Sequence, residues 1–479
     1  MVTGPMGWGV AVCLLLLLCA SVATARPAGL PPLRVSENRR SLVTQEGSPF
    51  FWLADTAWWI RRIAPAEVDL YLSTRERQRF TVVQIAPASG YTGTDYAGNT
   101  AFLDNSSDTP NEAFWRNIDA IVDKAKDHGL YVVLFPVWGE DFNGLVGTDA
   151  EKAHRLGLWL GRRYANRSHV LWAVSGEYDA INGFRLPISE AQKNVVNAMG
   201  RGLEEGHGNT QLMTIHPGVG RTSSLDFHHE AWLDLNMLQS GHVIDAEAFG
   251  MEENHALIAH DYALMPTKPV LDGEPMYEDT PDAVWVKQST EGPRGGAEVM
   301  REKAYWAVFA GACGHTYGHN DIYGFFVPSH PGQVVPLPEG PGQRGNWRDA
   351  LAAPGGAQMQ YLRALMESRP FLTRVPDQSL IVGDAGKGPR HVQATRDERG
   401  AYAMLYVPTA GQTVTVDTGK LSGTRLKAWW YDPRTGKATA LKGDFPVAGT
   451  LEFTTPDHGP DWVLVLDDVA KGYPKPGSG

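Results

Sequence analysis

Eight short apolar runs, separated by helical stretches, constrain the fold of this chain more than any other feature. The runs are rich in β-branched and other apolar residues. They are 50–55, 81–87, 131–138, 170–177, 212–217, 237–242, 269–274 and 311–319. Between them, segments such as 111–129, 150–166 and 297–311 place apolar residues at helical spacing. Apolar strands that alternate with helices predict a parallel sheet, and eight such units predict an α/β fold of the (β/α)8 barrel type.

The pattern changes after about residue 370. The later runs alternate apolar and polar residues between short turns rich in Gly, Asp and Pro, which predicts a small antiparallel β-sandwich. The predicted organisation is a signal peptide over 1–25, the (β/α)8 catalytic barrel over 33–370, the β-sandwich over 371–469 and a disordered tail over 470–479. The Pro- and Gly-rich loop 325–347 follows the eighth run, so we expect it to lie over the barrel mouth.

Three consecutive aromatic residues in the predicted sandwich, Trp429, Trp430 and Tyr431, indicate which faces of their strand are covered. Successive side chains of a strand point to opposite faces, so Trp429 and Tyr431 should share one face and Trp430 the other. At least one of these faces should pack against another layer. We therefore expect a structural domain that is docked on the barrel and carries no catalytic residue.

The first residues have the pattern of an export signal. An apolar core, Leu14–Leu18, is followed by the small-x-small cleavage pattern at 23–25. The apolar run is too short for a membrane span. We expect a secreted or periplasmic protein with no membrane contact after signal removal. Cys13 and Cys19 would leave with the signal, and Cys313 alone cannot form an internal disulfide.

The net charge and the aromatic content restrict the classes of molecule that the protein is expected to bind. The net charge of −11 argues against a nucleic-acid partner, which would normally require a basic face. The chain has 15 Trp, and aromatic rings stack on sugar faces, although any single Trp more often fills the core. These features favour a carbohydrate partner and leave the oligomeric state open.

Polar or aromatic residues end each of the eight runs. The carboxyl ends of barrel strands converge on one face, where active sites are built. The residues at these ends are Asp55, Gln84, Trp138, Glu177, His216, Gln239, His242, Glu274 and His315. This placement predicts an active site assembled from several strand ends.

Two of these end residues are carboxylates suited to glycoside cleavage. That reaction needs one acid to protonate the leaving oxygen and a second carboxylate to attack the anomeric carbon or to activate water. Glu177 ends the fourth run and Glu274 the seventh, so their ends should face each other across the barrel. Asp179 competes with Glu177 for the role of acid. Asp272 lies within its strand, where it would point into the barrel or orient a neighbour.

Other residues near the strand ends are candidates for sugar binding. They offer stacking rings or hydrogen-bonding groups and are Asp55, Trp58, Trp138, His216, Gln239, His242, Tyr277, Glu278, His315, Tyr317 and Asn320. The histidines also raise the alternative of a catalytic zinc. Such a site would need His-x-His after the first strand, and "LADTAWW" has none, so we predict no metal and no cofactor.

Several segments together resemble the apiosidase-like glycoside hydrolases, from about residue 33 to 370. They are "FWLADTAWW", "VLWAVSGE", "LDLNMLQSGH", "KPVLDGEPMYE" and "GACGHTYGHNDIY". The remaining segment resembles the β-sandwich of the collagen-binding type that commonly follows this barrel. The resemblance implies that Glu274 is the nucleophile of a retaining mechanism and that the carboxylate after strand four is the acid/base.

One position departs from the family pattern. The family usually has Gly-Gly-Asp where this chain has Ser175-Gly176-Glu177. The longer acid reaches about one bond further, which bears on the position of the leaving group and on the substrate. The alternatives to an apiosidase-like enzyme are another retaining glycosidase (galactosidase, arabinosidase or glucanase) acting on a plant or microbial polysaccharide or oligosaccharide, or a non-catalytic carbohydrate-binding barrel.

Overall fold

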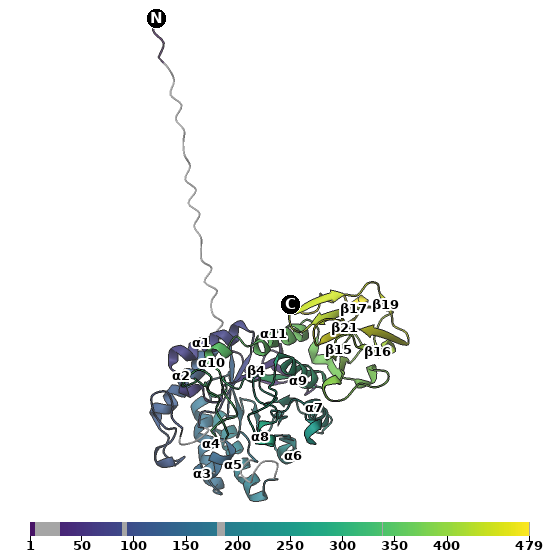
Figure 1. Ribbon diagram of the computed structural model, residues 1–479. Helices are drawn as coiled ribbons and strands as arrows, with labels where there is room; N and C mark the ends of the chain where they lie inside the picture. Colours follow the sequence, from purple (N-terminus) through teal and green to yellow (C-terminus); the bar gives the residue numbers. More distant parts are fainter. Residues whose placement is uncertain (5–28, 89–92, 180–186, 338, 479) are drawn as a thin grey trace.

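The computed structural model describes residues 1–4, 29–88, 93–179, 187–337 and 339–478 (Figure 1). The predicted signal peptide, 1–25, lies outside the described residues except for its first four. The chain forms a barrel and a smaller β-domain beside it.

The barrel has eight parallel strands in the described part of the chain, each of which overlaps one of the predicted runs. They are β4 Trp52–Thr56, β5 Val82–Ile85, β6 Tyr131–Leu134, β7 Val170–Ala173, β8 Met213–Thr214, β10 Asn236–Gln239, β11 Val270–Asp272 and β12 Gly314–Tyr317. Six of them pair side by side in the order β12-β4-β5-β6-β7-β8, and β10 pairs with β11. Single backbone hydrogen bonds bridge the two joins, from Asp234 N to Met213 O (2.9 Å) and from Cys313 N to Val270 O (3.0 Å). The predicted (β/α)8 fold is therefore confirmed.

Helices surround the strands. Among the described residues they are α1 Pro65–Arg77, α2 Glu112–Asp127, α3 Gly139–Leu145, α4 Ala150–Tyr164, α5 Glu190–His207, α6 Ser224–Phe227, α7 Asn254–Tyr262, α8 Val284–Lys287, α9 Ala297–Phe309, α10 Trp347–Ala350 and α11 Pro354–Glu367. None of the helices in these ranges is long and apolar enough to cross a membrane.

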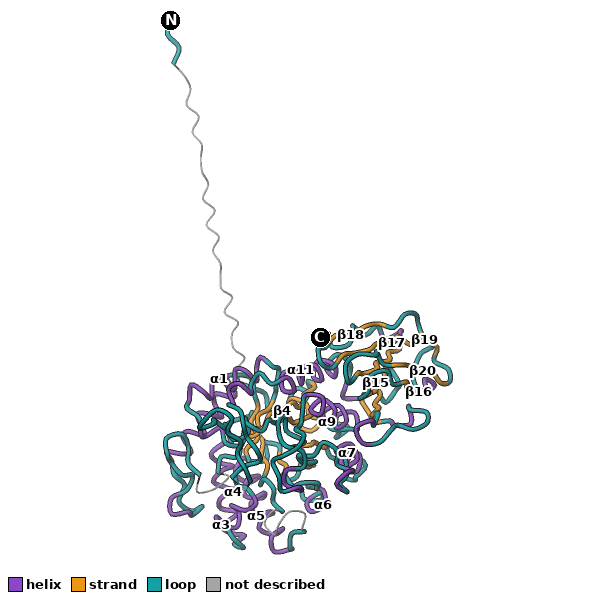
Figure 2. Tube along the Cα trace, viewed as in Figure 1, coloured by secondary structure: helices purple, strands orange, loops and turns teal. Residues whose placement is uncertain are grey.

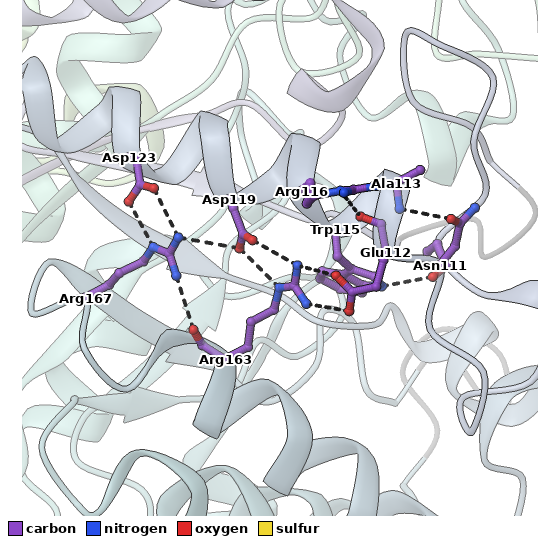
Figure 3. A network of polar contacts seen from close by, with 10 residues as sticks. Asn111, Glu112, Ala113, Trp115, Arg116, Asp119, Asp123, Arg163 and Arg167 are labelled. Carbon is purple, nitrogen blue, oxygen red and sulfur yellow. Dashed lines mark hydrogen bonds and ion pairs between the residues drawn. The ribbon is translucent and has the colours of Figure 1, made fainter.

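Neighbouring helices are also joined by charge. Figure 3 shows a ladder of ion pairs between α2 and the end of α4. Arg163 bonds Glu112 and Asp119, both at 2.9 Å, and Arg167 bonds Asp123 at 2.9 Å. These pairs are partly exposed, so each contributes modestly to stability, and their common effect is to fix the two helices side by side.

The amino ends of the barrel strands are closed by a small antiparallel sheet. Its strands are β1 Leu33–Val35, β2 Leu42–Thr44 and β3 Pro49–Phe50. Leu33, Leu42 and Phe50 pack with Trp52 and Tyr131, the first residues of β4 and β6. This end is therefore filled by apolar side chains, and the opposite end carries the polar strand termini.

The second domain is an antiparallel sandwich. Its strands are β13 Arg374–Pro376, β14 Gln393–Asp397, β15 Tyr402–Val407, β16 Thr413–Asp417, β17 Arg425–Asp432, β18 Lys437–Ala440, β19 Phe445–Pro446, β20 Thr450–Thr454 and β21 Trp462–Asp468. The large sheet runs β13-β14-β15-β21-β17-β18, and β16 pairs with β20 in a small second sheet (Figure 2). Trp430 packs between the two sheets, whereas Trp429 and Tyr431 belong to the cluster that continues into the barrel. The predicted division of the three rings is confirmed.

The sandwich is docked on helices α9 and α11 (Figure 1). Tyr305 of α9 stacks on Tyr406 of β15, with ring centroids 5.0 Å apart and planes 10° apart. Arg369, just after α11, holds Asp467 of β21 with two hydrogen bonds of 2.8 and 2.7 Å. Both charged side chains are almost fully buried. The predicted docking is therefore present.

The end of the chain differs from the prediction of a disordered tail over 470–479. The ring of Tyr473 lies against the guanidinium of Arg369 and the edge of Tyr402. Gly477 N donates a hydrogen bond of 3.2 Å to Ser368 Oγ. Over 470–478 the prediction was wrong, because one aromatic ring anchors a segment whose Pro and Gly content suggests no structure.

Candidate active site

Five neighbouring strand ends bring most of the predicted site residues together. Residues that follow β6, β7, β8, β10 and β11 meet there with two aromatic residues from the adjoining loops. The group consists of Trp58, Trp138, Glu177, His216, Gln239, His242, Glu274 and Tyr277.

Glu274 lies buried at the centre of this group, two residues beyond β11. His242 Nε2 is hydrogen-bonded to its Oε1 at 3.0 Å, and His216 Nε2 lies 3.3 Å from its Oε2 without a well-aligned hydrogen bond. Burial and the charge of this carboxylate hold the pKa of the Tyr277 hydroxyl well above its usual value. Burial alone would raise the pKa of Glu274, but the contacts with His216 and His242 outweigh burial and lower the pKa to about 2. Glu274 is therefore ionised at neutral pH.

Glu177 shows the opposite behaviour. It follows β7 and receives a hydrogen bond from Trp138 Nε1 at 3.0 Å, and the nearby side chain of Gln239 acts to lower its pKa. Burial and then the negative charge of Glu274 raise the pKa of Glu177 to about 7. The residue as a whole is partly exposed. The raised pKa favours the protonated form of Glu177 compared with an ordinary glutamate.

Two glycines leave the space that the backbone of Glu177 and the ring of Trp138 need. Glu177 has a φ of 41°, in the left-handed region that is unfavourable for residues with a side chain. A Cβ atom on Gly139 would lie 2.1 Å from the Glu177 carbonyl oxygen, and one on Gly176 would lie 2.1 Å from the Trp138 ring. The close approach of these backbones therefore fixes both Glu177 and the ring that bonds it. Strained backbone of this kind is often found at functional sites.

Aromatic rings pack together beside the carboxylates. The Trp58 ring is edge-on to Phe135 at 4.9 Å and to Trp138 at 5.1 Å, and its Nε1 donates to the Tyr277 hydroxyl at 3.0 Å. Tyr323 lies 6.1 Å from Tyr277. Phe135 and Tyr323 were not predicted as site residues. Phe135 belongs to a continuous apolar run that resembles core, and Tyr323 follows the last strand in a motif quoted for its histidines.

Asp179 is bonded to residues outside the carboxylate pair. Its side chain is fully buried, forms an ion pair with Arg221 at 2.5 Å and accepts a hydrogen bond from Gly218 N. Of the two candidates for the acid, Glu177 is therefore the one in electrostatic contact with Glu274. Asp272 also points away from the barrel interior and bonds Ser240 and Asn254.

Three predicted sugar-binding residues lie in a separate buried cluster. Asp55 forms an ion pair with Arg75 at 2.6 Å, and the Tyr317 hydroxyl donates to Glu278 at 2.6 Å. Arg75 lies over the ring of Tyr317 and links the two pairs. Asp55, Tyr317 and Glu278 were therefore wrongly predicted to face the substrate. Asp55 and Tyr317 are register partners on β4 and β12, and their side chains point outward, toward α1.

Two further predictions also need correction. His315 shares the outward face of β12 with Tyr317, because the intervening Thr316 accepts a hydrogen bond from Trp52 in the barrel interior. Asn320 donates to Pro341 O at 3.0 Å and so anchors the loop 325–347. Gln343 of that loop donates to the Tyr323 hydroxyl, which brings the loop to the edge of the site as predicted.

The site histidines contact the nucleophile candidate or aromatic rings. Within the described ranges, no group of three or more His, Cys, Asp or Glu side chains is arranged to hold a metal ion. The arrangement can supply one ionised carboxylate, one carboxyl that exchanges a proton near neutral pH, and rings for stacking.

Comparisons with known proteins identify the family of the barrel and the type of the second domain. Residues 36–373 match the family model "Apiosidase-like, catalytic domain", and residues 375–467 match the model "Putative collagen-binding domain of a collagenase". A solved structure described as a glycoside hydrolase is 32% identical, with a TM-score of 0.82, over 92% of this chain and 97% of that chain. A glycoside hydrolase of family 5 from Bacteroides vulgatus is also 32% identical, with a TM-score of 0.82, over 93% of this chain and 94% of that chain. No curated protein matches the sequence.

Proposed function

Because the chain belongs to the family of apiosidase-like catalytic domains, we propose that it is a retaining glycoside hydrolase with Glu274 as the nucleophile and Glu177 as the general acid and base. One observation carries the proposal. Glu274 lies between His216 and His242, which lower its pKa, while burial and the charge of Glu274 raise the pKa of Glu177, whose carboxyl is held by Trp138 Nε1. Such a separation of two pKa values is how one site provides an anion and an acid at the same pH.

In the first step, the Glu274 carboxylate attacks the anomeric carbon of the bound sugar. The glycosidic C–O bond breaks, and Glu177 gives its proton to the departing oxygen. The products are a covalent ester of the sugar with Glu274 and a free alcohol. His216 and His242 keep Glu274 ionised before the attack.

In the second step, Glu177 accepts a proton from a water molecule, whose oxygen attacks the anomeric carbon. The ester bond breaks, Glu274 is released as a carboxylate, and the sugar leaves with its original anomeric configuration. Loss of the Glu274 charge in the intermediate lowers the pKa of Glu177, which suits its change from acid to base.

The substrate that we propose is a plant or microbial polysaccharide or oligosaccharide. The rings of Trp58, Trp138 and Tyr323 beside the carboxylates support a sugar ligand, since aromatic rings pack on the apolar faces of sugars. We also propose export of the enzyme, as the sequence of residues 1–25 predicts, because such polymers lie outside the cell.

A panel of aryl glycosides tests the proposal. It should include apiosides, galactosides, arabinofuranosides and glucosides, because Glu177 is one methylene longer than the Asp that the family usually has. We expect the wild type to cleave at least one of them with retention of configuration in the first-formed product, followed by NMR. The variant Glu274→Gln should fold normally and lose activity by about 10³-fold or more.

Inversion of configuration, or near-normal turnover by folded Glu274→Gln, would contradict the assigned mechanism. Binding of sugars by the wild type without any turnover would support a non-catalytic barrel instead.

A further inference from the structure

The buried cluster behind the active site contains a carboxylate that the proposed reaction does not use. Glu278 accepts a hydrogen bond of 2.6 Å from the Tyr317 hydroxyl. It also accepts hydrogen bonds from Gly355 N at 2.9 Å and Gly356 N at 3.2 Å. The side chain is 5% exposed, and among the described residues its contacts are with donors only.

These donors include the first turn of α11. The amide groups at the start of a helix have no partner within the helix and favour a negative charge. The residue before α11, Ala353, has no side chain that can serve them. Glu278, from a distant part of the chain, therefore acts as the cap of α11.

The helix is built to receive this carboxylate. A Cβ atom on Gly355 would lie 2.4 Å from Glu278 Oε2, and one on Gly356 would lie 3.0 Å from the Tyr317 ring. Any larger residue at Gly355 would displace the Glu278 side chain. Burial raises the pKa of Glu278, and the three hydrogen bonds offset part of this rise.

The backbone of Glu278 is fixed as firmly as its side chain. Glu278 N donates to Gly318 O, and Asn320 N donates to Glu278 O, both at 2.9 Å. Gly318 in turn backs the neighbouring Tyr277, because a Cβ atom there would lie 2.3 Å from the Tyr277 ring. The position of Tyr277 is therefore set by how Glu278 is held.

Tyr277 is the link to the site. Its hydroxyl accepts from Trp58 Nε1 at 3.0 Å, and its ring lies 4.4 Å from that of His242, whose Nε2 is hydrogen-bonded to Glu274 at 3.0 Å. We propose that Glu278 is a positioning residue: by capping α11 it holds Tyr277 in place, and through the contact of Tyr277 with His242 it orients the carboxylate of Glu274. This inference rests on the proposed function only in calling Glu274 the nucleophile.

Two variants disturb the contact from opposite sides. Glu278→Gln replaces one of the two carboxylate oxygens with an NH2 group, which cannot accept the hydrogen bonds made to that oxygen, and Gly355→Ala pushes the unchanged carboxylate away. In both, we expect Tyr277 to shift, His242 to follow it, and Glu274 to lose its hydrogen bond from His242. The loss of one hydrogen bond to a charged group should raise the pKa of Glu274 by about one unit.

The pKa of Glu274 can be measured without any substrate. Carbon-13 NMR titration of labelled glutamate carboxyls, with the Glu274 signal assigned from Glu274→Gln, should show the same upward shift in Glu278→Gln and Gly355→Ala. With a cleaved substrate, kcat should fall about 10-fold or more in both variants, with a smaller change in KM.

Asp461→Asn is the matched control. Asp461 is also a buried carboxylate that accepts from a tyrosine hydroxyl, that of Tyr406, but it lies at the junction with the sandwich. It should lower the melting temperature without moving the pKa of Glu274. If folded Glu278→Gln and Gly355→Ala lose stability in the same way and leave both the Glu274 pKa and kcat unchanged, the positioning role is wrong. If the wild type cleaves no glycoside, the proposed function fails, while the NMR titration still decides the role of Glu278.

Discussion

Glutamate side chains on protein surfaces are charged at neutral pH, but Glu177 is placed where a charge is unfavourable. Its pKa near 7 comes from burial and from the charge of Glu274, whereas Trp138 and Gln239 act in the opposite direction. Because the acid form is the one that protonates the leaving group, kcat/KM should fall as the pH rises through about 7.

Replacing the acid should separate substrates by their leaving groups. Glu177→Ala should strongly impair hydrolysis of glycosides with poor leaving groups and impair activated aryl glycosides less, because the latter need little protonation. Added azide should partly restore turnover by occupying the space of the missing carboxylate. Asp179→Ala is the comparison, since its ion pair with Arg221 makes it structural. If Asp179→Ala shows this substrate pattern and Glu177→Ala does not, the two roles are reversed.

The same residue should lower stability at alkaline pH. Its pKa is about 7 in the folded protein and 4.5 in the unfolded chain. Below pH 4.5 Glu177 is protonated in both states and has no effect; above pH 7 it is ionised in both, and the folded state bears the full penalty. The shift corresponds to about 3 kcal/mol, which partial exposure reduces to about 1–2 kcal/mol. Glu177→Gln should therefore be more stable than the wild type at pH 8 and equal to it at pH 4, as measured by urea unfolding. Equal stability of the two proteins at both pH values would mean that folding does not change the pKa of Glu177.

Sequence reasoning at this scale located the carboxylate pair but not every neighbour. The strand-end rule placed Glu177 and Glu274 because it depends only on where an apolar run stops. It misplaced Asp55, His315 and Tyr317, because their strands are buried on both faces. Such a strand gives no alternation from which to read which side chains point inward.

At the scale of elements, α4 and α5 form an unusually close pair. Glycines on both helices face the backbone of the other. A Cβ atom on Gly157 would lie 2.3 Å from Met199 O, and one on Gly202 would lie 2.2 Å from His154 O. The sequence reveals α4 by its apolar periodicity, but the approach of the two backbones depends on the partner helix and could not be predicted from either segment alone.

Replacing a glycine at this contact with alanine should destabilise the protein, although the same change usually stabilises a helix. Gly→Ala in a helix interior normally stabilises by about 1 kcal/mol. Gly202→Ala should instead destabilise the protein by about 2–3 kcal/mol, because the backbones must separate. Arg201→Ala, at an exposed neighbouring position, serves as the control and should change stability by less than about 0.5 kcal/mol. Thermal unfolding of both variants measures the difference, and a stabilised Gly202→Ala would show that the helices can move apart freely.

At the scale of the whole molecule, the sandwich and the barrel share apolar surface and buried charge. Arg301 and Arg369 of the barrel pair with Asp461 and Asp467 of the sandwich, and all four side chains are nearly inaccessible to solvent. A buried charge that loses its partner is strongly destabilising. The barrel is therefore adapted to the presence of the second domain.

Removal of the residues after Pro376 should make the barrel aggregate or unfold. The truncation exposes the ring of Tyr305 and its neighbours and leaves Arg301 and Arg369 without their partners. Size-exclusion chromatography and circular dichroism measure the outcome. A control that ends at Lys471 removes only the terminal segment and should stay soluble with a lower melting temperature. A soluble, fully active barrel alone would show that docking is dispensable.

The two family models meet at residues 373 and 375, yet one apolar cluster runs across that boundary. A recombination event that joined this barrel to a different downstream module would break side-chain packing on both sides of the junction. A substitution at Tyr305 must likewise preserve the packing on Tyr406, and a substitution at Tyr406 must preserve the packing on Tyr305. The two halves should therefore be inherited together and change in concert, as a single evolutionary unit encoded by two recognisable segments.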